Sequence, residues 1–449
     1  MKRRRILKGL LGIPIGAGVG ISCVSYPRQK PGEEWRTNQI SKAREDEKDA
    51  DLLKNAKQNI ESFRKGNLKI NLRNGGKPIS NSEFELVQIK HDFGFGFTQM
   101  GEKTKNRLNE SQLKRLGNIF NNFTAKCYWN ERWHQPIETI EGQRIYSVFE
   151  SEIAIAKSLG MEVKGHPLVW TVPKALPDWF KKYPYEVRLE KMLHHVEDLV
   201  GRYKGKVELW DLCNEFLWEP SLRHTEDRKW PHIESLEEIL TYLEPAMKVA
   251  RKANPNARFV LNDYGLEKDY RTEISAKTQR TRYVELVTEM KKRGIAPDAI
   301  GTQCHVAEPF TMNEIQTCLD QLAEPGLPLQ ITEFWSRIDK KKTEVDEATL
   351  AYIENAYTIG FGHKSMELFT YWGGDLILDN GEPSLKLQAI EKLITKEWNT
   401  KTKFATDEKG QFETRGFYGS YSLKMGGKEI KQFHFGKIDN QKEIALDLN

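Results

Sequence analysis

Eight short apolar runs recur at regular intervals along most of the chain, and stretches with helical spacing separate them. The runs cover residues 93–99, 123–129, 161–170, 207–215, 257–264, 299–305, 327–334 and 366–373. Because these runs are nearly continuous in apolar residues and do not alternate, they are typical of parallel strands that helices bury on both faces. Eight strand–helix units in about 300 residues predict a closed (β/α)8 barrel, a TIM barrel of the α/β class, over residues 93–397.

An open, doubly wound parallel sheet is the alternative arrangement for such a pattern. That fold usually carries a glycine-rich phosphate-binding loop directly after its first strand. The segment at this place reads "FGFGFTQMGEK", which is a poor match. The closed barrel is therefore favoured.

The N-terminus has the features of an export signal over residues 1–22. A basic head and a short apolar stretch precede small residues and Cys23, as in secretory signals. "KRRRILK" also fits a twin-arginine signal, and "GISC" resembles a lipoprotein cleavage box in which Cys23 would carry the lipid. We expect export to the periplasm, to the outer membrane as a lipoprotein, or to the outside of the cell. Pro14 and the glycines disfavour an ordinary N-terminal helix.

Three further segments flank the predicted barrel. Residues 23–50 are polar and carry a charge run, which predicts a linker. Residues 51–92 predict a short helix and two strands around the turn "NGGKP", and residues 398–449 predict a small β-rich accessory module. Aromatic residues of this module are expected either in its core or on a face that stacks on sugars: Phe417, Tyr418 and Tyr421.

The charge of the chain is concentrated at its start. The formal net charge is 69 − 64 = +5, and residues 1–22 contain five cations and no acidic residue: Lys2, Arg3, Arg4, Arg5 and Lys8. The remainder of the chain is close to neutral, which argues against a broad nucleic-acid-binding surface. We expect a monomer whose only membrane contact is the N-terminal lipid anchor.

The cysteines do not have the spacing of a metal site. Four lie in the predicted barrel, and none forms a CxxC pair or stands near a histidine at ligand spacing: Cys127, Cys213, Cys304 and Cys318. Three of them end apolar runs, so we expect buried free thiols and neither a metal nor another cofactor.

Polar side chains gather where the predicted strands end. In barrels of this kind, the catalytic groups come from the C-terminal ends of several strands. The fourth run, "WDLCNE", ends in Asn214 and Glu215, and the seventh ends in Glu333. The other strand ends contribute imidazoles, amides and aromatic rings: His166, Trp170, Asn262, Asp263, Tyr264, Gln303, His305 and Trp372. These side chains are predicted to meet at one mouth of the barrel, with no serine nucleophile elbow among them.

Two glutamates with tryptophan neighbours suit the cleavage of a glycosidic bond. One carboxylic acid protonates the leaving oxygen, and the other carboxylate attacks the anomeric carbon, which retains the configuration. Taken singly, Glu215 and Glu333 are better explained as solvated acids at strand ends. That explanation must place both of them, and their polar neighbours, at the same end of successive strands by chance.

The motifs also resemble a known family. "GHPLVW", "WDLCNE", "LNDY", "GTQCH", "ITEF" and "YWGG" occur in the order found in glycoside hydrolase family 10, which contains endo-β-1,4-xylanases on a (β/α)8 barrel. The resemblance covers about residues 85–397, and the segment before the barrel is similar to the β segment of the plant-like branch. It implies that Glu215 is the general acid/base and Glu333 the nucleophile. It also implies a sugar subsite lined by His166, Trp170, Asn214, Gln303, His305 and Trp372, to which the strand end adds Tyr264 as a substrate-binding candidate.

Several positions depart from the family pattern. The family's Glu-Asn-Glu-x-Lys-Trp stretch is replaced by "FTAKCYWNERWHQP", in which Trp129 or Trp133 matches the tryptophan and Arg132 stands for the lysine. Thr171 replaces a histidine, "ITEF" is followed by Trp335 where aspartate is usual, and the second tryptophan after "YWGG" is missing. These changes leave the cleavage chemistry in place but put the specificity for xylan in doubt.

The sequence therefore supports hypotheses from different classes. The first is a retaining endo-glycoside hydrolase that cleaves β-1,4-xylan or a related plant polysaccharide by double displacement, without a cofactor. The second is a cell-surface glycan-binding protein that keeps the barrel and has weak activity or none. A third is a retaining hydrolase for a different β-glycan. Retention of both Glu215 and Glu333 favours an enzyme, because a binding protein does not need a nucleophile.

Overall fold

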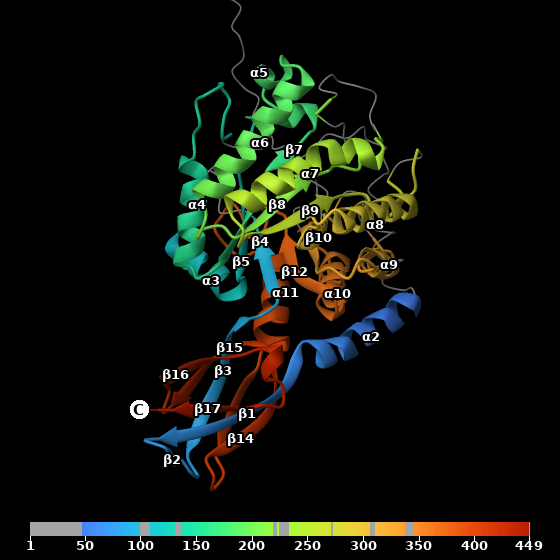
Figure 1. Ribbon diagram of the computed structural model, residues 1–449. Helices are drawn as coiled ribbons and strands as arrows, with labels where there is room; N and C mark the ends of the chain where they lie inside the picture. Colours follow the sequence, from blue (N-terminus) through green and yellow to red (C-terminus); the bar gives the residue numbers. More distant parts are fainter. Residues whose placement is uncertain are drawn as a thin grey trace, which may run out of the picture.

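The computed structural model describes most of the chain from residue 47 onwards (Figure 1). The described ranges are 47–98, 108–130, 136–218, 222–223, 233–270, 273–305, 310–336 and 345–448. The export signal, Cys23, nearly all of the linker, Arg132 and Trp133 lie outside these ranges, so the predictions made for them stay predictions.

The central element is a closed barrel of eight parallel strands. Its strands are β4 (Gly94–Phe97), β5 (Asn122–Lys126), β6 (Glu162–His166), β8 (Leu209–Asn214), β9 (Arg258–Asp263), β10 (Ala299–Thr302), β11 (Leu329–Phe334) and β12 (Met366–Tyr371). Neighbours in the chain pair with each other, β12 pairs with β4, and a short strand β7 (Val169–Trp170) pairs with β8 beyond the end of β6. The predicted (β/α)8 barrel is confirmed.

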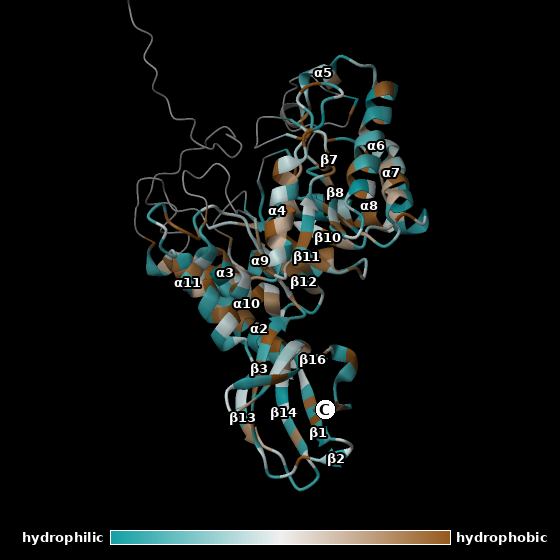
Figure 2. Cartoon of the chain, turned by 90° about the vertical axis from the view of Figure 1, so that its left-hand side faces the viewer, coloured by the Kyte–Doolittle hydropathy of each residue, from teal (hydrophilic) through white to brown (hydrophobic). Residues whose placement is uncertain are grey.

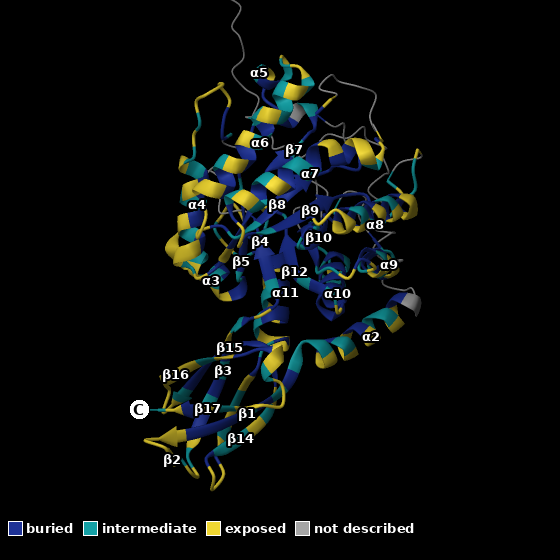
Figure 3. Cartoon of the chain, viewed as in Figure 1, coloured by how far each residue is buried: buried dark blue, intermediate teal, exposed yellow. Residues whose placement is uncertain are grey.

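Helices surround the barrel and bury its outer face (Figure 3). They are α3 (Glu110–Ile119), α4 (Ser147–Ser158), α5 (Asp178–Lys181), α6 (Tyr185–Arg202), α7 (Leu236–Ala253), α8 (Ala276–Lys292), α9 (Met312–Leu322), α10 (Glu347–Gly362) and α11 (Leu385–Lys392). Many of them begin at a side chain that accepts a hydrogen bond from the first helical turn, such as Ser235 of α7 and Thr311 of α9. These caps satisfy backbone N–H groups at the helix starts.

Close packing between strands and helices requires a glycine beside the predicted site. Gly165 of β6 stands where a Cβ atom would lie 2.2 Å from the ring of Trp210 on the neighbouring strand β8. The Trp210 ring is fully buried and packs against Phe149 of α4. Because only glycine leaves this space, the segment before His166 can approach β8 closely.

The chain ends pair with each other in a β sandwich. One sheet places β1 (Lys65–Asn74) between β14 (Gln411–Phe417) and β17 (Glu443–Asp447), with β2 (Lys77–Pro78) beside β1. The other has the order β13 (Lys401–Ala405), β3 (Glu83–His91), β15 (Gly419–Met425) and β16 (Lys428–Phe435). The sequence suggested two separate segments, whereas the structure joins them in the same sheets. Strand β1 pairs with β14 and β17, and β3 pairs with β13 and β15.

The three aromatic residues predicted to have a role in the C-terminal segment are buried. Phe417, Tyr418 and Tyr421 are 2%, 8% and 0% exposed, respectively. Tyr418 and Tyr421 pack with Phe435 inside the sandwich. Of the two expectations for these rings, the structure supports the core and not a sugar-stacking face.

The sandwich lies at the end of the barrel opposite to the predicted site (Figures 1 and 2). Strand β3 leads almost directly into β4, so the sandwich adjoins the N-terminal ends of the barrel strands. Helix α2 (Glu47–Phe63) runs along the barrel to this junction. Arg64 follows this helix. Its guanidinium donates hydrogen bonds of 2.7–2.8 Å to the carbonyls of Phe361, His363 and Met366. Across the described ranges, no helix has the length and apolar character needed to cross a membrane.

Candidate active site

The two predicted catalytic glutamates occupy the C-terminal ends of their strands. Glu215 follows β8 directly, and Glu333 is the fifth residue of β11. Each is 5% exposed. Glu215 has a φ of 60°, in the left-handed region that glutamate rarely adopts. Such backbone conformations persist where the surrounding structure holds a side chain in a required direction.

The carboxylate of Glu215 receives hydrogen bonds from an indole and an amide. Trp170 Nε1 donates to Oε2 over 2.7 Å, and Gln303 Nε2 donates to Oε1 over 3.2 Å. Trp170 lies on β7 and is partly exposed, whereas Gln303 directly follows β10 and is buried. Three separate strand ends thus meet at this carboxylate.

Both oxygens of Glu333 also have partners. Asn262 Nδ2 donates to Oε1 over 2.9 Å, and His305 Nε2 lies 3.1 Å from Oε2. His166 Nε2 is 3.9 Å from Oε1, so its ring also faces this carboxylate. Contacts on both oxygens hold the carboxylate in one orientation.

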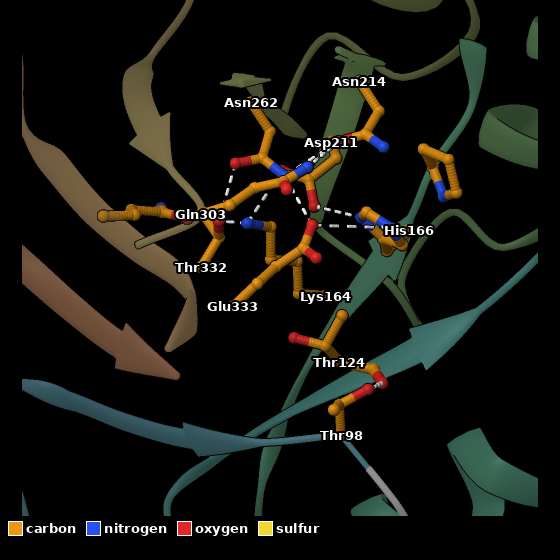
Figure 4. A network of polar contacts seen from close by, with 12 residues as sticks. Thr98, Thr124, Lys164, His166, Asp211, Asn214, Asn262, Gln303, Thr332 and Glu333 are labelled. Carbon is orange, nitrogen blue, oxygen red and sulfur yellow. Dashed lines mark hydrogen bonds and ion pairs between the residues drawn. The ribbon is translucent and has the colours of Figure 1, made fainter. Parts of the chain in front are cut away.

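A chain of buried amides connects the two glutamates, and Figure 4 labels its members Gln303, Asn214 and Asn262 together with Glu333. Asn214 Oδ1 accepts from Gln303 Nε2 over 3.3 Å and from Asn262 Nδ2 over 2.9 Å. Since Gln303 also contacts Glu215 and Asn262 also contacts Glu333, the network runs from one carboxylate to the other. Thr332 Oγ1 donates to Asn262 Oδ1 over 2.6 Å, which fixes the orientation of that amide.

Charged groups lie deeper in the barrel, beneath Glu333. His166 Nδ1 is 2.8 Å from Asp211 Oδ2, and Lys164 Nζ is 2.7 Å from Asp211 Oδ1. Burial alone would raise the pKa of Asp211, but the adjacent Lys164 and His166 outweigh it and hold the pKa below its usual value. Asp211 lies within the motif "WDLCNE" and Lys164 within the apolar run 161–170, and neither was predicted to have a role.

Aromatic side chains line the same mouth. The ring of Trp372 stands edge-on to His166 with centroids 5.1 Å apart, and Lys126 Nζ lies 4.9 Å from the Trp372 centroid. Tyr128 packs against both His166 and Trp170, with centroid distances of 5.8 Å and 5.7 Å. Lys126 and Tyr128 were missed from the sequence because they lie in the segment whose alignment to the family was ambiguous.

Two aromatic candidates lie away from the mouth. Tyr264 has no exposed surface and stacks on Trp218, which gives its ring a packing role. Trp129 is 7% exposed and stacks on His195 with centroids 4.2 Å apart. Of the two tryptophans proposed to match the family motif, Trp129 is therefore a core residue, and Trp133 lies outside the described ranges.

The remaining sequence-based candidates concern metals and thiols. Within the part of the chain that the structure describes, no group of three His, Cys, Asp or Glu side chains is placed to hold a metal ion. Buried free thiols were predicted in the barrel and are confirmed at Cys127, Cys213, Cys304 and Cys318.

The arrangement can provide an acid and a nucleophile on opposite sides of a sugar. Two carboxylates face one mouth, each held by its own donors, and partly exposed indoles stand beside them. Cleavage of a glycosidic bond by double displacement requires two such carboxyl groups, one as acid/base and one as nucleophile. His166, Trp170, Asn214, Gln303, His305 and Trp372 all lie in this assembly or contact it.

Curated proteins with similar sequences include a xylanase and an anti-sigma factor. An endo-1,4-beta-xylanase A from Caldicellulosiruptor sp. is 27% identical over 289 residues, which is 61% of this chain and 39% of that protein. The anti-sigma-I factor RsgI6 of Acetivibrio thermocellus is 26% identical over 384 residues, or 82% of this chain and 46% of that protein. The chain thus spans less than half the length of these curated relatives.

Solved structures share the barrel. The GH10 structure from Paenibacillus barcinonensis superposes with a TM-score of 0.54 at 23% identity, over 68% of this chain and 95% of that chain. Xylanase 10B from Thermotoga petrophila, solved in complex with xylobiose, has the same TM-score at 22% identity and similar coverage. At this identity the likeness shows the fold. The model of glycosyl hydrolase family 10 matches residues 88–376, and the chain therefore belongs to this family.

Proposed function

We propose that the protein is a retaining endo-β-1,4-glycanase that cleaves xylan or a related plant polysaccharide by double displacement. The observation that carries this proposal is the amide chain Gln303–Asn214–Asn262, which joins Glu215 to Glu333 at the barrel mouth. Several relatives are named endo-1,4-beta-xylanases, which supports xylan as the first substrate to test.

The two glutamates have distinct roles in this reaction. Glu333 attacks the anomeric carbon while Glu215 gives a proton to the departing oxygen, and a glycosyl ester forms on Glu333. Glu215 then removes a proton from a water molecule, which attacks the anomeric carbon and displaces the Glu333 carboxylate. The contacts of Asn262 and His305 suit Glu333 to the first role, because they hold its carboxylate in one orientation.

The surrounding groups are suited to hold a sugar. Because Oδ1 of Asn214 accepts from two amides, its Nδ2 is the group that can donate to a sugar hydroxyl. Trp170 and Trp372 are partly exposed and offer indole faces or edges to the apolar surface of a sugar ring. His166 stands between Trp372 and Glu333, where it can contact a hydroxyl next to the cleavage point.

Glycan binding without cleavage is the second candidate. One relative that matches 82% of this chain is named an anti-sigma-I factor, so this barrel also occurs in a protein that is not named as a hydrolase. Lys126 over Trp372 is a further feature that would alter how a sugar stacks on this ring. We also propose that the N-terminal signal directs export and that Cys23 carries a lipid. Export suits a protein that acts on polysaccharides outside the cytoplasm.

Incubation with xylan, mixed-linkage glucan and cellulose tests the proposal. We expect a ladder of xylo-oligosaccharides by chromatography and an early fall in viscosity, which indicates internal cleavage. Glu333→Gln is the matched control, because it changes one oxygen to an amide nitrogen at nearly constant volume. Binding of xylohexaose by calorimetry with no product from any polymer would contradict the hydrolase and favour the binding protein.

A further inference from the structure

A buried lysine joins two segments at the mouth of the barrel. Lys386 lies in the first turn of α11, and its side chain is only 1% exposed. Its Nζ donates to the backbone carbonyl of Ser336 and lies 2.7 Å from Asp375 Oδ2. Because Ser336 follows β11 and Asp375 follows β12, this one side chain contacts the segments that leave two neighbouring strands.

These two segments carry residues of the candidate active site. Ser336 is three residues after Glu333, and Asp375 is three residues after Trp372. Within the described ranges, the backbone pairing between β11 and β12 ends at the 2.7 Å hydrogen bond from Trp372 N to Phe334 O. Beyond this bond, the lysine provides a polar link between the two segments.

The Asp375 carboxylate packs against the turn that follows Trp372. Tyr371 Oη donates to Asp375 Oδ1 over 2.9 Å, and the lysine holds the other oxygen. Gly373 lies in this turn, and a Cβ atom on it would be 2.5 Å from Asp375 Oδ1. It would also be 2.7 Å from the ring of Tyr371 and 3.0 Å from that of Trp335. These groups enclose the turn, so the direction of the Trp372 ring depends on where Asp375 lies.

The stability of α11 does not explain a lysine at this position. Cations are unfavourable near the N-terminus of a helix, because the backbone N–H groups there carry partial positive charge. Burial of an ammonium group also costs free energy, whereas a leucine or methionine would pack here without a desolvation penalty. The contacts that such an apolar residue would lack are those with Ser336 and Asp375.

Trp372 and Glu333 differ in how far they depend on this lysine. Both carboxylate oxygens of Glu333 have partners at other strand ends, Asn262 and His305. The Trp372 indole is partly exposed, and its ring stands edge-on to His166. Loss of the lysine is therefore expected to displace Trp372 and to leave Glu333 in place.

We propose that Lys386 is a positioning residue, which fastens the segment after Glu333 to the segment after Trp372. It thereby holds the Trp372 ring in the place where a sugar would stack. Its counter-ion Asp375 is 37% exposed, so without the lysine this carboxylate would turn toward water and release the turn at Gly373. The effect on the ring is a property of the free protein, whereas the effect on turnover rests on the proposed function.

Fluorine NMR of the free protein, labelled with 5-fluorotryptophan, tests the position of the ring. Trp372→Phe identifies the Trp372 signal by its loss, and Trp210→Phe identifies a fully buried control in the barrel. Lys386→Met keeps a long unbranched side chain without the charge. In this variant we expect the Trp372 signal to move and the Trp210 signal to stay. A folded Lys386→Met protein with an unchanged Trp372 signal would overturn the proposal.

Tyr371→Phe covers the case in which Lys386→Met does not fold. It removes only the hydroxyl that donates to Asp375 Oδ1, and it leaves no buried charge without its partner. The Trp372 signal should also move in this variant, by a smaller amount. An unchanged signal would contradict the dependence of the ring on Asp375.

Kinetics test the consequence for catalysis. Lys386→Met should raise KM for xylohexaose on the order of 10-fold and leave kcat within about threefold, because binding is weakened while Glu333 keeps its contacts. Lys392→Met is the matched control and should change neither value, since Lys392 lies on the same helix but pairs with Glu354 and Glu397. Equal losses of kcat and kcat/KM in Lys386→Met, or a lower melting temperature without any change in KM, would contradict the proposal.

The two measurements separate this proposal from the proposed function. Failure of the proposed function appears as a wild-type protein that neither cleaves nor binds xylohexaose, and the NMR measurement then decides the role of Lys386 alone. In a wild-type protein that binds without cleaving, the same effect should appear as a Kd that rises on the order of 10-fold in Lys386→Met.

Discussion

Asn262 on β9 holds Glu333 on β11 through a 2.9 Å hydrogen bond from Nδ2 to Oε1. The same nitrogen donates to Asn214 over 2.9 Å, and Thr332 fixes the other end of the amide. The direction of one catalytic carboxylate therefore depends on a residue two strands away around the barrel. Asn262 is fully buried, so we expect it to contact the Glu333 carboxylate and not the substrate itself.

Replacement of Asn262 is expected to impair catalysis more than folding. Asn262→Ala removes a donor to Glu333, and we expect kcat/KM to fall roughly 10²-fold because the carboxylate loses its fixed orientation. Asn262→Asp should be worse, because a second carboxylate next to Glu333 opposes its ionisation. Asn71→Ala is the matched control, since Asn71 also donates to a glutamate but lies in the sandwich. Equal losses in the Asn262 and Asn71 variants would contradict this role.

The acid role of Glu215 predicts a dependence on the leaving group. Glu215→Ala should slow cleavage of xylo-oligosaccharides, whose leaving alcohols need a proton, by about 10²–10⁴-fold. Aryl glycosides with activated leaving groups should be affected much less in the formation of the glycosyl-enzyme. Steady-state rates on both substrates measure this difference, and the same loss on both would exclude Glu215 as the acid.

The nucleophile role of Glu333 predicts chemical rescue. Glu333→Ala leaves space beside the anomeric carbon and lacks the attacking oxygen, so azide should restore turnover of activated glycosides. The product should have the configuration opposite to that of the natural product, because only one displacement takes place. Polarimetry or NMR identifies the anomer, and wild-type rates in Glu333→Ala without azide would refute the assignment.

Two buried histidines make stability depend on pH. Burial lowers the pKa of His91 to about 4 and that of His195 to about 3. In the unfolded chain these groups take up protons near pH 6.5, whereas the folded protein stays neutral until much lower pH. Stability from these histidines is therefore fully present above about pH 6.5 and is lost as the pH falls toward 4. Each should contribute a loss of about 2 kcal/mol between pH 6.5 and pH 5.

His195→Phe separates this effect from general acid unfolding. Neither ring nitrogen of His195 has a hydrogen-bond partner among the described residues, and the ring stacks on Trp129, so phenylalanine should fit. We expect urea unfolding midpoints that fall less between pH 7.5 and pH 5 than those of the wild type. An unchanged slope would show that His195 takes up its proton at the same pH in the folded protein and in the unfolded chain.

The barrel was predictable because its strands leave a local signature. The run 257–264 contains the whole of β9, and 327–334 contains β11, since strands covered on both faces need apolar residues throughout. The sandwich was not predictable as one unit. Lys65 pairs with Phe417 and Lys69 pairs with Glu443, across more than 340 residues, and no local pattern in either segment reveals these pairings.

The site was predictable where polar residues end strands, and less so inside them. Glu215 and Glu333 stood out because strand ends of such barrels carry the chemistry. Lys164 and Asp211 precede those ends and read as part of the strand, so only the structure places them against each other and His166. Tyr264 shows the opposite error, because a strand-end position does not determine which way a ring turns.

Shared sheets predict that the C-terminal segment does not fold alone. Strand β1 is the central partner of β14 and β17, and β3 lies between β13 and β15. A peptide of residues 398–449 should give the circular dichroism and poorly dispersed NMR spectrum of an unfolded chain. Addition of a peptide with residues 47–92 should restore dispersion if the two pieces assemble. A well-dispersed spectrum of the C-terminal peptide by itself would contradict this expectation.

Mass spectrometry of a trapped intermediate tests the central claim most directly. A 2-deoxy-2-fluoro-β-xylobioside with an activated leaving group should glycosylate the protein slowly and release its sugar more slowly still, because fluorine destabilises both oxocarbenium-like transition states. We predict a mass increase of one fluorinated disaccharide, located on Glu333 by peptide mapping and abolished in Glu333→Gln. A label on a different residue, or hydrolysis of xylan by a protein that never carries the label, would contradict the assignment.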